Sequence, residues 1–184
     1  MIVLGIDEVG RGSLAGPLVI GAVVLASAIE GLTDSKLLSK KQRNKFALLI
    51  KQDAEFIGLG WVSEAEIDNI GLSSALVLAA NRSIINLTMR IDEIIIDGTV
   101  NFLAPNKLSR ALVKADISIQ SVSAASVIAK TERDKYMATL ATEYPQYGFD
   151  SNMGYGTKYH LEAIRKYGPC QSHRKSFEPI KSFY

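Results

Sequence analysis

Residues 1–17 read MIVLGIDEVGRGSLAGP, and this stretch decides the start of the fold. Residues 1–6 are apolar and rich in β-branched side chains, a composition typical of a short buried strand. Two acids, Asp7 and Glu8, come directly after it, and a glycine-rich turn around Arg11 follows. Carboxylates beside apolar residues are strongly disfavoured when unpaired. The pattern therefore predicts that a metal ion, a basic side chain or solvent at a sheet edge neutralises them.

Composition restricts the class of protein. With 184 residues, 47% of them hydrophobic, the chain is long enough for one domain with a substantial core, so residues 1–184 are predicted to form a single domain. No apolar run reaches eighteen residues, so neither a membrane helix nor membrane association is expected. The single cysteine, Cys170, excludes an internal disulfide and a cysteine-rich zinc site and favours the reducing cytoplasm.

Basic residues gather in the last quarter of the chain, although the net charge is only +2. The residues concerned are Lys158, Arg165, Lys166, Arg174, Lys175 and Lys181. Such a group can contact a phosphate backbone, or it can be an ordinary solvated surface, which charge alone favours.

Hydrophobic periodicity and turn residues predict an alternation of strands and helices. We expect strands over residues 18–26, 56–62, 93–96 and 111–113, the first of them paired as an antiparallel hairpin with residues 1–6. We expect helices over residues 40–53 (capped by Ser39), after Ser63, over 72–89, from Ser121 or Ser123 to about 144, and over 158–166, with loops between them and a polar tail. These elements predict one mixed α/β domain.

Three predicted strands end in acids. Asp7 with Glu8 follows the first, Asp97 the fourth and Asp116 the fifth. Each alone is an ordinary turn residue, but together they would bring four carboxylates to one place, where only bound cations relieve their repulsion. Oxygen ligands favour hard ions such as Mg²⁺ or Mn²⁺, and a pair of these ions is suited to phosphoryl chemistry.

Asp134, on the predicted long helix, has two open interpretations. It can add a fifth carboxylate to the metal site, or it can be a surface residue paired with Lys130 or Arg133. The sequence favours neither.

Seven motifs together resemble the bacterial ribonuclease HII family, the type 2 ribonucleases H. They span nearly the whole chain in the family's order: DEVGRGSLAGP from Asp7, DSK from Asp34, IDG from Ile96, KAD from Lys114, SAASVIAKTERD from Ser123, GYGTKYH from Gly154 and HRKSFEP from His173. The resemblance implies a ribonuclease H-like α/β fold, with a mixed sheet of about five strands flanked by helices and a short helical and loop C-terminal part.

The resemblance also implies the activity and its partners. It predicts an endoribonuclease that hydrolyses the RNA strand of RNA–DNA hybrids and nicks DNA on the 5′ side of a single embedded ribonucleotide, leaving 3′-hydroxyl and 5′-phosphate ends. Two ions, Mg²⁺ or Mn²⁺, are expected in the site when substrate is bound. A monomer is expected, and recruitment by a replication clamp is left open.

Site residues follow from the matching motif positions. The catalytic and metal-binding acids are Asp7, Glu8, Asp97 and Asp116, with Asp134 as a further acid near the metal. Contacts to nucleic acid are assigned to the junction-reading turn and the sugar-packing tyrosine, Gly10, Arg11, Gly12 and Tyr155, and more weakly to phosphate contacts at Lys158, His173, Arg174 and Ser176. Two departures from the family pattern are Ala115, where glycine is expected, and a chain that ends soon after Phe177.

Three other interpretations are weaker. A dinucleotide-binding domain needs a different glycine spacing and a helix, not a β-branched strand, after the turn. A type 3 ribonuclease H or another nuclease of the superfamily shares clustered acids but lacks the GRG turn with the GYGT loop, and type 3 enzymes usually have an extra N-terminal domain. A non-catalytic nucleic-acid-binding module would not need converging acids.

Overall fold

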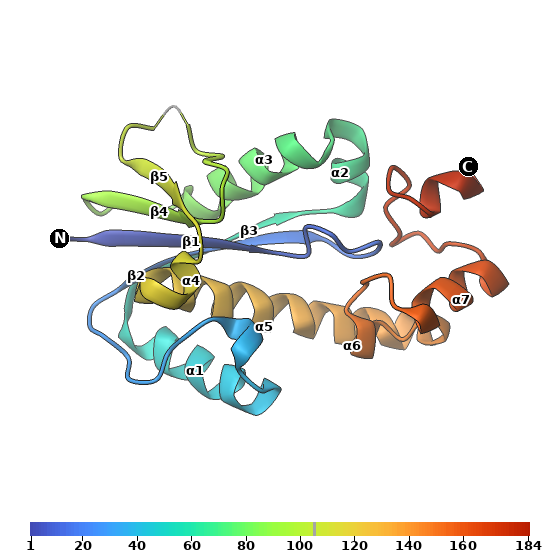
Figure 1. Cartoon of the computed structure of the whole chain (residues 1–184), viewed down its shortest axis with the longest axis horizontal. Coiled ribbons are helices and arrows are strands. Elements are labelled where there is room, and N and C mark those ends of the chain that lie inside the picture. Colours follow the sequence, from blue (N-terminus) through green and yellow to red (C-terminus); the bar gives the residue numbers. More distant parts are fainter. Residues whose placement is uncertain (105) are drawn as a thin grey trace.

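The computed structural model describes residues 1–104 and 106–184, which form a helix–sheet–helix arrangement of three layers (Figure 1). The strands of the sheet lie in the order β3-β2-β1-β4-β5. Their bounds are β1 Val3–Val9, β2 Leu18–Leu25, β3 Ala54–Val62, β4 Glu93–Asp97 and β5 Ser109–Leu112. The mixed α/β fold predicted from the sequence, with about five strands, is confirmed.

Helices cover both faces of this sheet. Figure 1 shows α2 and α3 on one face, α1, α4 and α5 on the other, and α6 and α7 beyond the end of the sheet. The bounds are α1 Lys40–Asp53, α2 Glu64–Ile70, α3 Leu72–Ile84, α4 Ala115–Ser118, α5 Gln120–Glu143, α6 Phe149–Asn152 and α7 Lys158–Tyr167. In the described part of the chain, no helix is both long and apolar enough to span a bilayer.

Strand β1 lies in the middle of the sheet and determines where the acids are placed. It pairs antiparallel with β2, as the predicted hairpin requires, and parallel with β4. Ile6 is opposite Ile96, so Asp7 and Asp97 are the next residues along two neighbouring parallel strands. Both isoleucines are buried in the core on the α3 side. Because side chains alternate between the faces of a strand, Asp7 and Asp97 project toward the α5 side.

The predicted helix starts at Ser39 and Ser63 are confirmed. Each serine accepts a hydrogen bond from the backbone N–H three residues later, and the side chain there, Gln42 or Glu66, accepts from the serine N–H in return. These reciprocal capping boxes satisfy backbone donors that the first helical turn leaves free.

Several predicted boundaries are wrong. Strand β1 continues to Val9, because pairing with β2 extends through the acids, which therefore lie inside the strand and not after it. Helix α3 ends at Ile84, and Leu87 and Met89 continue the apolar pattern only because they pack on the same core from a turn. Strand β5 begins at Ser109, two residues earlier than predicted, and ends at Leu112, one residue earlier than predicted.

The second half of the chain differs more. Asp116 is in the first turn of the short helix α4, after a left-handed residue, and not at a strand end. Helix α5 begins at Gln120, so neither Ser121 nor Ser123 caps it, and both are buried within it. The predicted loop before α7 contains the short helix α6.

The predicted polar tail is in fact packed against the rest of the molecule. His173 and Arg174 are buried, and Ile180 belongs to the core formed by the end of α5, α6 and α7. His173 lies against His160 of α7, with 3.0 Å between their Nε2 atoms. Burial lowers the pKa of both histidines, and that of His173 falls to about 4. The folded protein therefore holds a neutral histidine pair.

We expect Gly5→Ala to destabilise the protein. Gly5 of β1 faces the backbone of Ser121 in α5, and a Cβ there would overlap its carbonyl group. Forcing the strand and the helix apart should lower the free energy of unfolding by about 1–3 kcal/mol, measured by urea denaturation. Gly12→Ala is the control, because a Cβ at Gly12 meets no atom within 4 Å. Equal unfolding midpoints for the two variants would contradict this packing.

We expect His173 to make stability depend on pH. Since its folded pKa lies below the unfolded value, the unfolded chain binds the proton first, so stability is lost as the pH falls from about 6.5 toward 4. His173→Gln keeps one acceptor and one donor but does not titrate. Between pH 7.5 and 5 the free energy of unfolding should fall by about 1–2 kcal/mol more for the wild type than for His173→Gln. Parallel pH profiles of the two proteins would refute the assignment.

Candidate active site

A cleft of about 400 Å³ opens where β1 reaches the turn into β2. Acids, cations, glycine backbone and an aromatic ring all face it, from four separate segments of the chain. The side chains and backbone that line it are those of Asp7, Glu8, Val9, Gly10, Arg11, Gly12, Ser35, Lys36, Ser126, Lys130 and Tyr155.

The acids of β1 are the most perturbed groups of the cleft. Burial, with the nearby carboxylates of Glu8 and Asp97, raises the pKa of Asp7 to about 7, although a hydrogen bond with Ser126 opposes the shift. Burial also raises the pKa of Glu8, against the effect of Arg11, whose Nη1 lies 3.4 Å from Glu8 Oε1. This site is therefore short of positive charge.

Asp97 and Asp116 adjoin the cleft through the α4 turn. Asp97 Oδ1 accepts hydrogen bonds from the backbone N–H of Ala115 at 2.8 Å and of Asp116 at 3.4 Å. Burial raises the pKa of Asp116, and the charge of Asp97 adds to this effect. The buried methyl group of Ala115 is accommodated here while its N–H supports Asp97, so alanine at this position preserves the acid arrangement.

Lys36 is the cation of this acid group. Its Nζ lies 3.6 Å from Asp116 Oδ2. Burial alone would lower its pKa, but the carboxylates of Asp34, Asp7 and Asp116 outweigh burial and raise it. Lys36 therefore offsets part of the negative charge.

The donor set fits a hard divalent ion. Asp7, Glu8, Asp97 and Asp116 supply carboxylate oxygens, which Mg²⁺ and Mn²⁺ prefer, and the raised pKa values of three of them indicate that a further cation would be stabilising. Within residues 1–104 and 106–184, however, no three Asp, Glu, His or Cys side chains already stand in an arrangement that could hold one ion. Metal binding is therefore supported by the type of ligand atoms and by their raised pKa values, and not by a coordination geometry that is already formed.

The glycine turn rests on a buried arginine from the C-terminal segment. Arg174 is fully buried and donates hydrogen bonds to the carbonyl oxygens of Gly10 at 2.6 Å, Arg11 at 3.0 Å and Gly16 at 2.8 Å. The prediction that Arg174 contacts phosphate directly is therefore corrected, because its guanidinium lies beneath the turn and has no exposed surface. Its role here is to position the turn.

A second buried arginine, Arg133 of α5, supports the other side of the same loop. It donates to the carbonyl oxygens of Pro17, Ala15 and Met153 at 2.9, 3.2 and 2.9 Å and to Ser13 Oγ at 2.8 Å. Burial lowers the pKa of both arginines, and their mutual repulsion helps to bring that of Arg174 to about 10. Sequence reasoning missed Arg133, since it could not distinguish a buried arginine from a surface one on the helix.

The two outer glycines of the turn have different reasons for lacking a side chain. Gly10 has φ +82°, and a Cβ there would meet Arg133. Gly12 is open to solvent, so its backbone is accessible to a ligand. Between them, the Arg11 side chain is half exposed at the rim of the cleft. In the structure, Gly10, Arg11 and Gly12 line the same cleft as Asp7 and Glu8.

Tyr155 faces the cleft from the loop before α7. Its ring lies 5.8 Å from the guanidinium carbon of Arg133, and its carbonyl oxygen accepts a hydrogen bond from His160 Nδ1 at 2.9 Å. The buried histidine pair therefore anchors the tyrosine's backbone, which is a structural role for His160 and His173. Tyr155 as a whole is 37% exposed, and its ring faces the cleft.

Asp134 is buried and lies outside the lining of this cleft. Its carboxylate pairs with Lys130 at 2.8 Å and Arg43 at 3.5 Å. The pairing with Lys130 is therefore confirmed, but the alternative partner Arg133 and the predicted surface position are both wrong. Lys130 lines the cleft from the same helix. Asp134 is connected to the cleft through its ion pair with this lysine.

The remaining predicted residues are not brought to the cleft lining. Lys158 is exposed at the start of α7, 4.0 Å from Glu162. Ser176 is bound to Asp68 through both its N–H and its hydroxyl. Two cleft cations, Lys36 and Lys130, were missed as functional residues, although the DSK and SAASVIAKTERD motifs that contain them were recognised.

Comparison with known proteins identifies the family. A family model described as Ribonuclease HII matches residues 4–180. The chain is 42% identical to Ribonuclease HII of Bacillus subtilis, with 99% of this chain and 71% of the relative covered. It is 46% identical to that of a Geobacillus strain, covering 97% of this chain and 65% of the relative. For Ribonuclease HII of Chlamydia caviae, 44% identical, these shares are 98% and 85%.

Solved structures agree on the fold. Ribonuclease H2 from Pyrococcus horikoshii superposes with a TM-score of 0.79 and 29% identity, covering 100% of this chain and 97% of that one. Bst-RNase HIII in complex with Mn²⁺ shares the fold alone, with a TM-score of 0.71 and 20% identity over 100% of this chain and 69% of the other. The acid cleft and the fold agree with these relatives. The chain therefore belongs to the ribonuclease HII family and is a hydrolase of the ribonuclease H type.

Proposed function

We propose that this protein hydrolyses the RNA strand of RNA–DNA hybrids as a metal-dependent endonuclease, and that it also nicks DNA on the 5′ side of a single embedded ribonucleotide. The observation that carries the proposal is the placement of Asp7 and Asp97 side by side on parallel strands, with Asp7 lining a cleft that also presents an open glycine backbone and a tyrosine ring.

Asp7, Glu8, Asp97 and Asp116 would hold the divalent ions, two Mg²⁺ or two Mn²⁺ in this proposal. Such ions lower the pKa of the attacking water and stabilise charge on the leaving 3′-oxygen. The acids themselves contribute fixed positions for their carboxylate groups. Asp7 and Asp97 are on paired strands, and Asp97 is also held by two backbone N–H groups. Cleavage of the bond between phosphorus and the 3′-oxygen would leave 3′-hydroxyl and 5′-phosphate ends.

Asp134 is proposed to act beside the metal site and not within it. Its oxygens already pair with Lys130 and Arg43, so an ion would have to displace one of these cations. The same ion pair keeps the Lys130 ammonium near the cleft, where it can contact a substrate phosphate.

Recognition of the ribose is assigned to the turn and to Tyr155. The exposed backbone at Gly12 can approach a 2′-hydroxyl, and Arg11 can donate to the neighbouring phosphate. The ring of Tyr155 offers a flat face to the adjoining sugar. The buried charges of Arg133 and Arg174 beneath this loop favour an anionic strand above it.

Association and location stay predictions. A monomer in the cytoplasm, folded as one domain, remains the expectation. A solved complex is described as PCNA:RNase HII from Archaeoglobus fulgidus, but that relative is 24% identical and shares the fold alone, with a TM-score of 0.81 over 97% of this chain and 96% of that chain.

Asp7→Asn should abolish most cleavage without unfolding the protein. Losing the carboxylate removes a central metal ligand, so the rate should fall by several orders of magnitude, while removal of a buried acid among acids should leave the unfolding midpoint unchanged or raised. The assay is cleavage of an end-labelled hybrid with Mg²⁺, with Mn²⁺ and with chelator. Exposed Asp150→Asn is the matched control and should keep wild-type activity. Activity of Asp7→Asn near that of this control would refute the site.

Tyr155→Ala should lose selectivity for single ribonucleotides. One lost aromatic contact to a nucleotide should reduce cleavage of a DNA duplex with one ribonucleotide about tenfold, and cleavage of a long hybrid less. The measurement is kcat/KM on both substrates. Tyr159→Ala, which removes an exposed tyrosine of α7, is the control. If Tyr155→Ala and Tyr159→Ala have the same substrate ratio, the tyrosine does not read the junction.

A further inference from the structure

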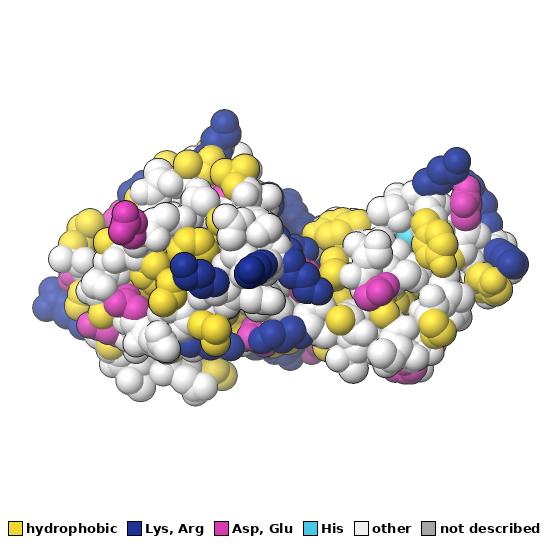
Figure 2. All heavy atoms as spheres, turned by 90° about the horizontal axis from the view of Figure 1, so that it is seen from below, with side chains coloured by type: hydrophobic (Ala, Val, Ile, Leu, Met, Phe, Trp, Pro, Cys, Tyr) yellow, Lys and Arg dark blue, Asp and Glu magenta, His cyan; other side chains and the backbone are white. Residues whose placement is uncertain are grey.

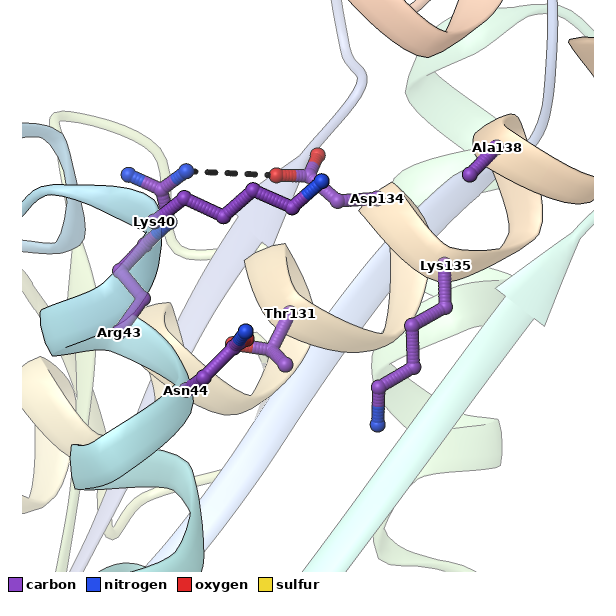
Figure 3. Close-up of a pocket in the computed structure, with 7 residues that line it drawn as sticks. All are labelled: Lys40, Arg43, Asn44, Thr131, Asp134, Lys135 and Ala138. Atoms are coloured by element: carbon purple, nitrogen blue, oxygen red, sulfur yellow. Dashed lines mark ion pairs between the residues drawn. The ribbon is translucent and has the colours of Figure 1, made fainter.

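A second cavity, of about 120 Å³, lies between α1 and α5, next to the acid cleft but separate from it. In Figure 3, Lys40 and Arg43 of α1 reach toward Asp134 of α5 and Asn44 lies beside Thr131, while Lys135 extends away from them. The cavity is lined by Lys40, Arg43 and Asn44 of α1 and by Thr131, Asp134, Lys135 and Ala138 of α5.

Two polar atoms at this cavity are buried and unsatisfied. Thr131 Oγ1 and Arg43 Nε have no hydrogen-bond partner among the described residues. Thr131 is 95% buried, its relative exposure being 5%, and it lines the cavity, as Figure 3 shows. Buried donors without partners are rare in folded proteins, so these two atoms indicate that a ligand supplies acceptors here.

The donors of the cavity suit an oxyanion. Asp134 is already neutralised by Lys130 and Arg43, which leaves the ammonium of Lys40 without an ion pair among the residues that the structure describes. The Nε–H of Arg43, the hydroxyl of Thr131 and the amide of Asn44 can each donate to an oxygen. Four donors with surplus positive charge around a small cavity match a phosphate group.

The position of the cavity indicates which phosphate. On α5, Ser126, Lys130 and Asp134 follow one another at intervals of four residues, about 6 Å along the helix axis. Ser126 and Lys130 line the acid cleft, and Lys130 bonds to Asp134 in the cavity wall. Figure 2 shows Lys and Arg side chains gathered beside the place where the molecule narrows, on the face that is lowest in Figure 1. A duplex with its scissile phosphate in the cleft would thus have other phosphates within reach of this cavity.

We propose that the α1–α5 cavity binds a backbone phosphate of the nucleic-acid duplex, away from the cleaved bond. The proposal rests on the proposed function for its substrate, but it concerns binding and not hydrolysis. The cavity adds a second fixed point for the duplex, so that the register of the strand over the acids is set by two phosphate positions.

The first test compares Lys40→Gln with Lys41→Gln. Both remove one exposed charge from α1, but only Lys40 lines the cavity. Binding of a short RNA–DNA hybrid is measured by fluorescence anisotropy with chelator present, so that no cleavage occurs. Lys40→Gln should raise Kd about 3- to 10-fold and reduce the slope of log Kd against log salt by about 1, relative to Lys41→Gln. Equal Kd values and slopes for the two variants would overturn the proposal.

A second variant and substrate locate the contact. Thr131→Val keeps the shape of the side chain and removes the unpartnered hydroxyl, and thermal unfolding checks that it folds. Neutral methylphosphonates are placed singly along each strand of the hybrid. One position should weaken wild-type binding but leave binding by Lys40→Gln and Thr131→Val unchanged. The absence of any such position would overturn the assignment of the cavity to the duplex. It would do so even if inorganic phosphate alone shifts the NMR resonances of Thr131, because the cavity would then bind a free anion and not the duplex.

The outcomes also separate this proposal from the proposed function. If the protein binds hybrid with the predicted Lys40 dependence but cleaves neither substrate with Mg²⁺ or Mn²⁺, the cavity assignment stands and the catalytic proposal fails. If it cleaves normally and the Lys40 and Lys41 variants behave alike, the catalytic proposal stands and the cavity assignment fails.

Discussion

The turn between β1 and β2 depends on two buried guanidinium groups. Arg133 and Arg174 are fully buried, and in the described part of the chain neither has a carboxylate within ion-pair distance. Burying a charge is costly unless hydrogen bonds replace its hydration. Here backbone carbonyls of the turn, and of the residue before the tyrosine loop, supply that replacement. The β1–β2 turn and the C-terminal segment are thereby tied into one unit.

This arrangement complements the acid cleft beside it. Burial and the neighbouring carboxylates raise the pKa values of Asp7, Glu8 and Asp116. This cost to stability is expected at a site that binds cations and an anionic strand. Positive charge is supplied from beneath by the arginines and from the side by Lys36 and Lys130. Such a layout favours binding of a polyanion over the turn. Among the acids, Asp116 forms an ion pair with Lys36 and Glu8 forms one with Arg11.

Much of this was predictable from the order of residues. Ser39 and Ser63 predicted helix starts correctly, because capping is a local interaction. The apolar runs predicted the strands within a few residues. The ends of elements were less predictable: β1 extends through Asp7 and Glu8 because its partner strand continues to pair, and the apolar pattern beyond Ile84 reflects packing from a turn. Pairing and packing of this kind depend on residues distant in sequence.

By itself, the sequence determined the motifs, the donor chemistry of the acids and the family that they indicate, since these depend on which residues are present and in what order. Only the tertiary structure decided which charges are buried. It placed Arg174 beneath the turn and not on a phosphate, paired Asp134 with Arg43, and brought Lys36 to Asp116. The physical reason is that burial and charge pairing arise from contacts between distant segments, and no local pattern distinguishes a buried arginine from an exposed one.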